Sequence, residues 1–302
     1  MRTVSGADKK VVEIHQYGSR HWVGDGFPVR NLIPGNRVGE QLSPFLLLDY
    51  AGPEKFDPTD RPRGVGEHPH RGFETVTIVY DGVVAHRDST GSGGVIGPGD
   101  VQWMTAASGI VHEEMHEKEW AKKGGVFHAI QLWVNLPRAH KMSNPGYQTL
   151  LRGDIPVVEL VDGAGDLRVI AGEFRGTSET MPRGIRGPAK TFTPVHLYDV
   201  RVKAGHVAEI AVPAGLNTAV FVLQGGVSVN GSSQAQEAEL VHLDKSGERI
   251  MLNATADTIL LVLAGEPIDE PVARYGPFVM NTKAELVQAV NDYQAGKMGH
   301  LS

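Results

Sequence analysis

The amino-acid sequence predicts an all-β protein made of two similar β-rich halves and ending in one short helix. Glycine and proline supply 37 and 18 of the 302 residues and are scattered along the chain, a pattern typical of many short strands joined by tight turns. A strand–turn–strand pattern occurs once in each half, and helical spacing appears near the C-terminus. Apolar segments run through the whole length, which argues against extended disorder.

The strand–turn–strand pattern is ETVTIVYDGVVAHRDS at residues 74–89 and TAVFVLQGGVSVNGSS at residues 218–233. Asp81-Gly82 is a hairpin signal in the first copy, and a Gly-Gly pair takes its place in the second. An offset of 143 residues sets Gly82 on Gly225 and Gly72 on Gly215. The match indicates a duplicated β-domain.

We place an N-terminal domain at residues 1–148 and a C-terminal domain at residues 149–302. The glycine- and proline-rich residues 176–190 read as a loop or linker. Residues 281–299, NTKAELVQAVNDYQAGKMG, predict the helix. Thr282 and Glu285 have capping-box spacing, and Gly296 supplies a stop signal.

Composition excludes several classes of function. The chain has no cysteine, so it has no disulfide, thiolate metal site or cysteine nucleophile. A formal net charge of −6 and the lack of a basic cluster argue against direct nucleic-acid binding. The sequence contains no run of 18 apolar residues, so no membrane-spanning helix is expected. The first 20 residues have no apolar signal-peptide core. A cytoplasmic protein is expected.

Two dyads of ligand-type side chains carry the chemistry. His68 and His70 are spaced i, i+2, and His112 and Glu114 repeat that spacing 44 residues later. Side chains two apart on a strand leave the same face, so two such strands in one barrel give a three-histidine, one-carboxylate metal site. A lone HxH is more often a surface or hydrogen-bonded pair, but the second dyad and the β-rich setting favour the metal. Imidazoles with one carboxylate suit Fe, Mn, Ni, Cu or Zn.

The same segment also spells HExxH, from His112 to His116. That zinc-protease motif works only on a helix, where i and i+4 share a face and the glutamate acts as general base. Ser108 to Val111 reads as a turn followed by a strand, so the protease remains a remote alternative.

Several sequence blocks closely resemble the pirin family, a branch of the cupin superfamily. The blocks are HPHRGFETVT, GPGDVQWMTAASGIVHEE, QLWVNLP, LAGEPIDEPV and YGPFVMNT, in order over nearly the whole chain. The resemblance implies two tandem cupin barrels (double-stranded β-helix or jelly-roll) with metal in the N-terminal barrel only. It assigns the ligands to His68, His70, His112 and Glu114. It also implies one divalent ion per chain, usually Fe(II), with Ni, Cu, Mn, Zn or Co as alternatives.

The resemblance leaves two functions open. Some bacterial members resemble quercetin 2,3-dioxygenase, which implies a flavonol or similar phenol and O₂ as substrates and Glu114 as the general base. Animal members are described as iron-dependent transcriptional co-regulators, which implies a protein partner in place of a substrate. Fold resemblance does not choose between these functions, because cupins host many chemistries.

Four further residues are candidates to support the ligands. Arg71 and Glu74 flank the first dyad, and Glu74 takes the position of a carboxylate ligand in many cupins. We expect Glu74 to orient a ligand or to pair with Arg71, with an ordinary surface pair as the alternative. Gln131 and Trp133 share one face of the strand AIQLWVNL, where Gln131 is placed to line the metal cavity and Trp133 to support it.

The offset of 143 residues tests the claim of a single metal. It sets His68 on Ala211 and His70 on Pro213, and neither residue ligates through its side chain. The second barrel is therefore expected to lack the metal.

Overall fold

The computed structural model describes residues 6–16, 18–33, 41–176 and 184–301. The chain divides into two compact units, each assembled from separate stretches of sequence. The first, here the histidine unit, comprises described residues 18–33, 44–152 and 268–301. The second, the companion unit, comprises described residues 6–16, 41–43, 153–176 and 184–267.

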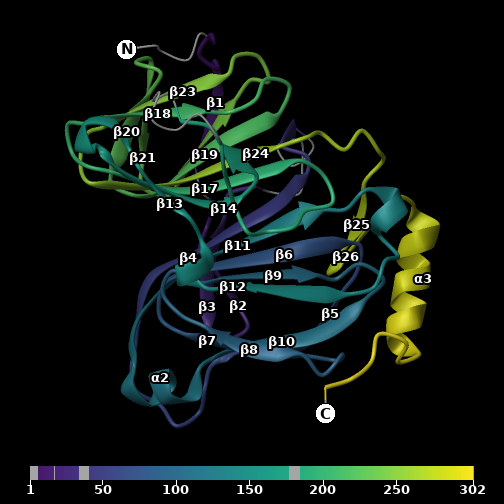
Figure 1. The fold of residues 1–302 in the computed structure, drawn as a ribbon. Helices are drawn as coiled ribbons and strands as arrows, with labels where there is room; N and C mark the ends of the chain where they lie inside the picture. Colours follow the sequence, from purple (N-terminus) through teal and green to yellow (C-terminus); the bar gives the residue numbers. More distant parts are fainter. Residues whose placement is uncertain (1–5, 17, 34–40, 177–183, 302) are drawn as a thin grey trace. The chain divides into compact units, whose positions relative to one another are not determined.

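The histidine unit contains two large antiparallel sheets (Figure 1) and a two-stranded one. The seven-stranded sheet has the order β12 (Gly146–Leu150), β9 (Val101–Thr105), β6 (Phe73–Asp81), β11 (Gly125–Asn135), β4 (Phe45–Phe56), β3 (Phe27–Asn31) and β2 (His21–Val23). The four-stranded sheet has the order β5 (Gly64–His70), β10 (Ile110–His116), β7 (Val84–Asp88) and β8 (Gly93–Ile96). The unit also contains β25 (Ala273–Tyr275), β26 (Phe278–Met280), α2 (Lys118–Lys123), α3 (Lys283–Gln294) and η1 (Arg138–His140).

The companion unit repeats this arrangement. Its seven-stranded sheet has the order β1 (Val11–Gln16), β22 (Glu239–Leu243), β19 (Asn217–Gln224), β24 (Thr258–Gly265), β17 (Val195–Val202), β14 (Gly165–Ala171) and β13 (Val157–Glu159). Its four-stranded sheet has the order β18 (Val207–Ala211), β23 (Arg249–Ala254), β20 (Gly226–Val229) and β21 (Ser233–Gln236). The smaller elements are β15 (Glu173–Phe174), β16 (Ile185–Arg186) and η3 (Val161–Gly163), and η2 (Arg152–Asp154) spans the boundary between the two units in the sequence.

Strand order confirms the duplication, because every strand of one unit's two sheets has a counterpart at the same place in the other. Gly82 and Gly225 have φ of 91° and 83°, and Gly72 and Gly215 have φ of 90° and 87°. Glycine adopts this region without the steric penalty of a Cβ. The offset therefore aligns the same backbone turns in both copies.

The expected hairpin at Asp81-Gly82 is wrong. β6 pairs with β9 and β11, whereas β7 pairs with β8 and β10. The turn at Gly82 carries the chain from one sheet to the other, as a jelly-roll requires. The same holds for β19 and β20 in the companion unit.

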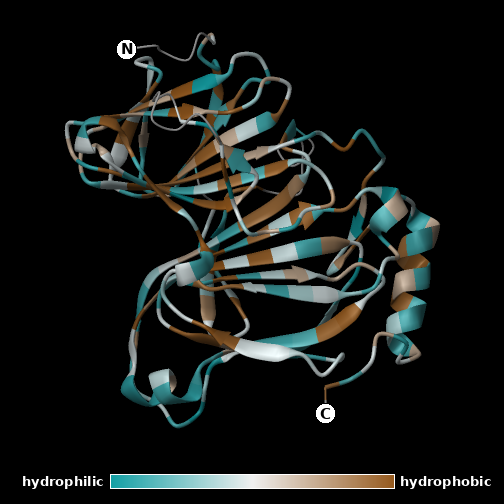
Figure 2. Ribbon diagram, viewed as in Figure 1, coloured by the Kyte–Doolittle hydropathy of each residue, from teal (hydrophilic) through white to brown (hydrophobic). Residues whose placement is uncertain are grey.

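Apolar side chains fill the space between the two sheets of each unit. In the histidine unit, Val79 and Phe127 from the large sheet pack with Val84 and Ile96 from the small one. Figure 2 shows hydrophobic colour along the strands of both units, whereas α2 is mostly hydrophilic. The central strands are buried on both faces, as in β6, where residues 73–79 are all buried, and their β-branched and aromatic side chains favour strand structure.

The C-terminal helix is confirmed as α3. Thr282 is its N-cap, and a reciprocal capping box joins Thr282 and Glu285. The short helix α2 was not expected, and Glu117 caps it through a hydrogen bond from the Trp120 amide, 2.8 Å long. Within the described residues, no helix has both the length and the apolar character needed to cross a membrane.

The bounds of the units differ from the expected single division after residue 148. β1 from the N-terminal segment completes the large sheet of the companion unit, and residues 268–301 belong to the histidine unit. In the expected linker at residues 176–190, Ile185–Arg186 form β16, which pairs with β15, and residues 177–183 lie outside the described residues.

Candidate metal centre

Strands β5 and β10 bring the two dyads together. They pair antiparallel, with His112 directly opposite His68 and Ile110 opposite His70. The ring centroids of the three imidazoles lie 4.2 to 4.9 Å apart, and one nitrogen from each lies within 4.8 Å of the others. The two strands therefore bring the three histidines together, as their i, i+2 spacing predicted.

The three imidazoles have the chemistry of metal ligands. His112 is fully buried, and within the described residues neither of its ring nitrogens has a hydrogen-bond partner; the same holds for Nδ1 of His70. Nδ1 of His68 lies 2.7 Å from the Gly66 carbonyl oxygen, which leaves Nε2 available to a metal. A backbone partner on the second nitrogen is typical of a metal-ligating histidine. Three neighbouring imidazoles, two of them buried, fit a divalent ion.

Burial keeps the imidazoles of His70 and His112 neutral. Desolvation lowers the pKa of His70 and of His112 well below the ordinary value, and neighbouring histidines lower both further. A neutral imidazole keeps the lone pair that a metal needs.

Glu114 lies on the same strand as His112, but a β-bulge separates the two positions in the pairing with β5. Its carboxylate is outside the group of nitrogens that the histidines form. Gln131 Nε2 donates to both carboxylate oxygens, at 2.9 and 3.2 Å, and the Thr77 hydroxyl donates at 3.3 Å. Thr77 was not identified from the sequence. It shares one face of β6 with Thr75, and this is the face that meets Glu114.

Trp133 forms an aromatic wall beside the histidines. Its ring meets that of His70 edge-on at 5.4 Å and lies 4.2 Å from that of Phe73. The guanidinium of Arg274, a residue of β25, lies 5.5 Å from the centre of the Trp133 ring, which is a cation–π distance. The structure thus places both Gln131 and Trp133 at the site.

The expected pairing of Arg71 with Glu74 is wrong, and neither residue is on the surface. Arg71 pairs with Asp292 at 2.9 Å. Glu74 accepts a hydrogen bond from the Thr105 hydroxyl at 2.7 Å, and burial raises the pKa of Glu74 to about 7. Because residues on a strand alternate between faces, Glu74 lies on the face of β6 opposite to Thr77 and so faces away from Glu114.

The HExxH reading is contradicted, because Ile110–His116 form a β-strand. His116 lies among aromatic rings, including those of Phe56 and Phe127, and its Nε2 lies 3.0 Å from the Gly26 carbonyl oxygen. Glu113 pairs with Arg87 at 2.6 Å. Neither residue takes the role that a zinc protease requires.

His86 is a further buried residue near the site. It lies opposite Glu114 in the pairing of β7 with β10, and its ring stacks on that of Tyr147 at 5.1 Å. Both nitrogens of His86 are without a hydrogen-bond partner among the described residues. His86 stands alone in the sequence, with no second histidine at i+2 to single it out, and only the strand register shows that it neighbours Glu114.

The companion unit lacks the ligands at the matching places. Ala211 takes the place of His68, and the residue opposite it on β23 is Arg249, which pairs with Asp8. Within the described residues, the one cluster of three ligand-type side chains close enough to hold an ion is that of His68, His70 and His112.

Comparisons with known proteins agree with this organisation. The family model named Pirin matches residues 26–134, and the model named Pirin C-terminal cupin domain matches residues 197–299. A Pseudomonas aeruginosa protein whose name provisionally assigns it quercetin 2,3-dioxygenase activity is 54% identical over 289 residues, 96% of this chain and 98% of its own. Pirin-like protein 2 of Arabidopsis thaliana is 40% identical over 284 residues, 91% of this chain and 81% of its own.

The fold matches a solved structure over almost its whole length. The crystal structure of quercetin 2,3-dioxygenase from Acinetobacter baumannii is similar with a TM-score of 0.92 and 49% identity, covering 98% of this chain and 100% of that one. The fold is thus that of two cupin domains. The chain belongs to the pirin family.

Proposed function

We propose that this protein is a metal-dependent dioxygenase of the quercetin 2,3-dioxygenase type. The observation that carries the proposal is the convergence of three imidazoles, two of them buried and one half-buried, each of which brings one ring nitrogen within 4.8 Å of the others. His68, His70 and His112 would hold one ion, with Glu114 as the fourth ligand from the same strand as His112. We propose iron(II) as the resident ion, with nickel, copper, manganese, zinc or cobalt able to take its place.

The proposed substrate is a flavonol or a similar enolisable phenol, together with O₂. Support comes from the name of the Acinetobacter baumannii enzyme, which is 49% identical over nearly the whole chain. The half-buried ring of Trp133 beside His70 supplies an aromatic surface, and planar rings pack well against such a surface. When bound, a divalent ion lowers the pKa of a coordinated hydroxyl and so favours the phenolate.

Glu114 is the residue that we propose to accept the proton of the substrate hydroxyl. A general base must lie within hydrogen-bonding reach of the proton that it takes, and Glu114 follows His112 on the same strand. Gln131 and Thr77 hold its carboxylate by three contacts of 2.9 to 3.3 Å. These donors limit the rotation of the carboxylate and keep it directed toward one position.

The experiment is aerobic incubation of iron-loaded protein with quercetin after the iron content has been measured. We expect loss of the flavonol absorbance and release of CO, and we expect His112→Ala, which removes a ligand, to show neither. Metal-loaded protein that leaves quercetin and related phenols unchanged would contradict the proposed activity. Such protein, if it captured partners only in the iron-loaded state, would favour the regulatory function instead.

A further inference from the structure

The C-terminal segment of the chain packs against the end of the strand that carries His68 and His70. Arg71, directly after His70, forms a parallel bridge with Phe278 of β26. The Arg71 amide donates to the Pro277 carbonyl at 3.3 Å, and the Val279 amide donates to the Arg71 carbonyl at 3.0 Å. A residue about 200 positions away in sequence thereby fixes the backbone beside a candidate ligand.

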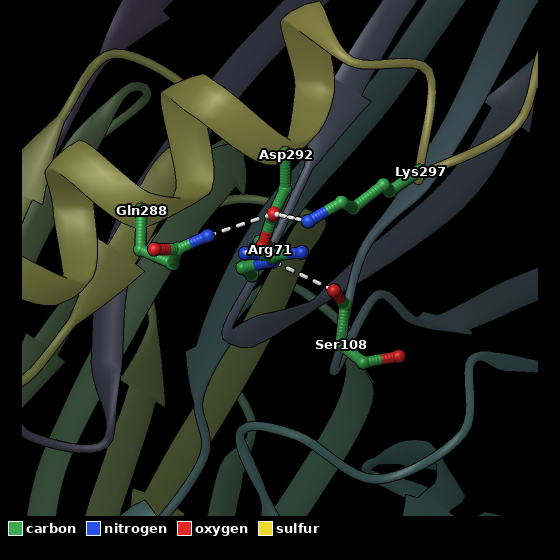
Figure 3. Close-up of polar contacts among 5 residues, drawn as sticks. All are labelled: Arg71, Ser108, Gln288, Asp292 and Lys297. Carbon is green, nitrogen blue, oxygen red and sulfur yellow. Dashed lines mark hydrogen bonds and ion pairs between the residues drawn. The ribbon is translucent and has the colours of Figure 1, made fainter.

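The Arg71 guanidinium joins three parts of the unit. It is buried, its Nε donates to the Ser108 carbonyl at 2.6 Å, and its Nη1 donates to Asp292 Oδ2 at 2.9 Å (Figure 3). Ser108 lies just before β10, the strand that carries His112, and Asp292 lies on α3. One side chain therefore links the ends of both ligand-bearing strands to the helix.

Asp292 is held firmly in this network. Its Oδ1 accepts from Gln288 Nε2 and from Lys297 Nζ, each at 2.8 Å (Figure 3). Hydrogen bonds from Lys297, Arg71 and Gln288 hold the pKa of Asp292 far below its ordinary value. The carboxylate thus remains charged and keeps its partners across the pH range in which the protein would work.

Two other contacts fix the same strand ends. The buried Lys141 ammonium donates to the carbonyls of Gly72 and Val279, at 2.7 and 3.0 Å, and so joins the turn after Arg71 to β26. Val111, the neighbour of His112, packs in one apolar cluster with Leu286 and Ala289 of α3. Alternation on β10 places Val111 on the α3 side of the strand and His112 on the other side.

We propose that Arg71 and Asp292 are positioning residues for the metal centre, so that docking of α3 and binding of metal stabilise one another. The inference rests on the proposed metal site and adds to it a residue from the far end of the chain. A metal tolerates only small errors in ligand distance, and strand ends fray easily. Two strand ends joined to one helix supply the register that three histidines need.

The linkage has a reciprocal consequence. If docking of α3 raises metal affinity, metal binding must strengthen the docking of α3 by the same factor. A bond with a merely structural role would lower stability without this dependence on metal.

The experiment measures cobalt(II) affinity and amide hydrogen exchange in wild type, Asp292→Asn and Arg71→Lys. Cobalt(II) absorption reports ligand geometry, and competition with a chelator gives the dissociation constant. We expect both variants to bind cobalt about 10- to 100-fold more weakly, the usual effect of losing a group that supports a ligand. In the wild type, cobalt should slow exchange at residues 283–297, and in Asp292→Asn this protection should be lost.

The matched control is Asp199→Asn. It breaks a buried arginine–aspartate pair with Arg168, 3.1 Å long, in the companion unit. We expect it to lower stability but to leave cobalt affinity within about threefold of wild type, since distant sites act independently.

Three results would overturn the inference. The first is that folded Asp292→Asn or Arg71→Lys binds cobalt as tightly as the wild type. The second is that Asp199→Asn loses as much cobalt affinity as these two variants. The third is that cobalt binds to the wild type without changing hydrogen exchange at α3. The last needs no variant, so it tests the inference even if the substitutions prevent folding. Failure of the wild type to bind any metal would instead overturn the proposed function, and this inference with it.

Discussion

The side-chain amide of Gln131 donates to both carboxylate oxygens of Glu114, at 2.9 and 3.2 Å. Gln131 lies on β11 in the large sheet and Glu114 on β10 in the small one, so the contact crosses the interior of the histidine unit. A carboxylate held by hydrogen bonds from the facing sheet cannot rotate freely. The relationship connects the scaffold to the group that we propose as the proton acceptor.

Replacing Gln131 by leucine should slow turnover more than it reduces metal content. The variant removes the amide that orients Glu114 while leaving the three histidines in place. We expect the rate of flavonol loss per bound iron to fall about 10- to 100-fold, the usual effect of losing a hydrogen bond that orients a ligand. The control is Gln234→Leu at an exposed position of the companion unit, and an unchanged rate in Gln131→Leu would show that the contact is unimportant.

Glu74 should make the histidine unit less stable as pH rises. Burial raises its pKa from 4.5 to about 7, so the folded state holds a proton that the unfolded state releases. The stabilising contribution is complete below pH 4.5 and is lost as pH rises through 7. At about 1.4 kcal/mol per pH unit, the shift corresponds to about 3 kcal/mol of unfolding free energy.

Glu74→Gln should remove this part of the pH dependence. Urea unfolding at several pH values, followed by tryptophan fluorescence, is the measurement. The fluorescence reports only the histidine unit, because all four tryptophans lie in it. An exposed substitution, Glu67→Gln, should leave the profile unchanged, and an identical profile in wild type and Glu74→Gln would refute the assignment.

His116 should matter for stability and not for metal. Its ring is buried among aromatic side chains, and its Nε2 bonds to the Gly26 carbonyl. His116→Ala leaves a cavity and an unpaired carbonyl, so we expect a loss of about 2 to 4 kcal/mol of unfolding free energy. Metal per folded chain should equal that of wild type, and a variant that is folded but free of metal would contradict this purely structural role of His116.

The sequence predicts the histidines well because their placement depends only on alternation. Side chains at i and i+2 share a face wherever a strand forms, so each dyad can be found before any tertiary contact is known. The duplication is visible for a similar reason, since Gly82 and Gly225 require the same unusual backbone conformation.

Partners across the fold are not visible in the same way. Arg71 and Asp292 are 221 residues apart, and nothing local to either indicates the other. The wrong hairpin after β6 has the same origin, because a turn signal reports that the chain reverses and not which strand it then joins. The predicted role of Glu74 beside the ligands was wrong because its neighbours in sequence lie near the site, whereas its own side chain lies on the other face of β6.

The amount of iron bound per chain in wild type and His112→Ala tests the central claim most directly. We expect about one iron per wild-type chain and close to none in the variant, with hydrogen exchange in β19 and β24 unchanged because the companion unit stays folded. Equal iron in the two proteins would contradict the account, since it would place the metal somewhere other than the three histidines.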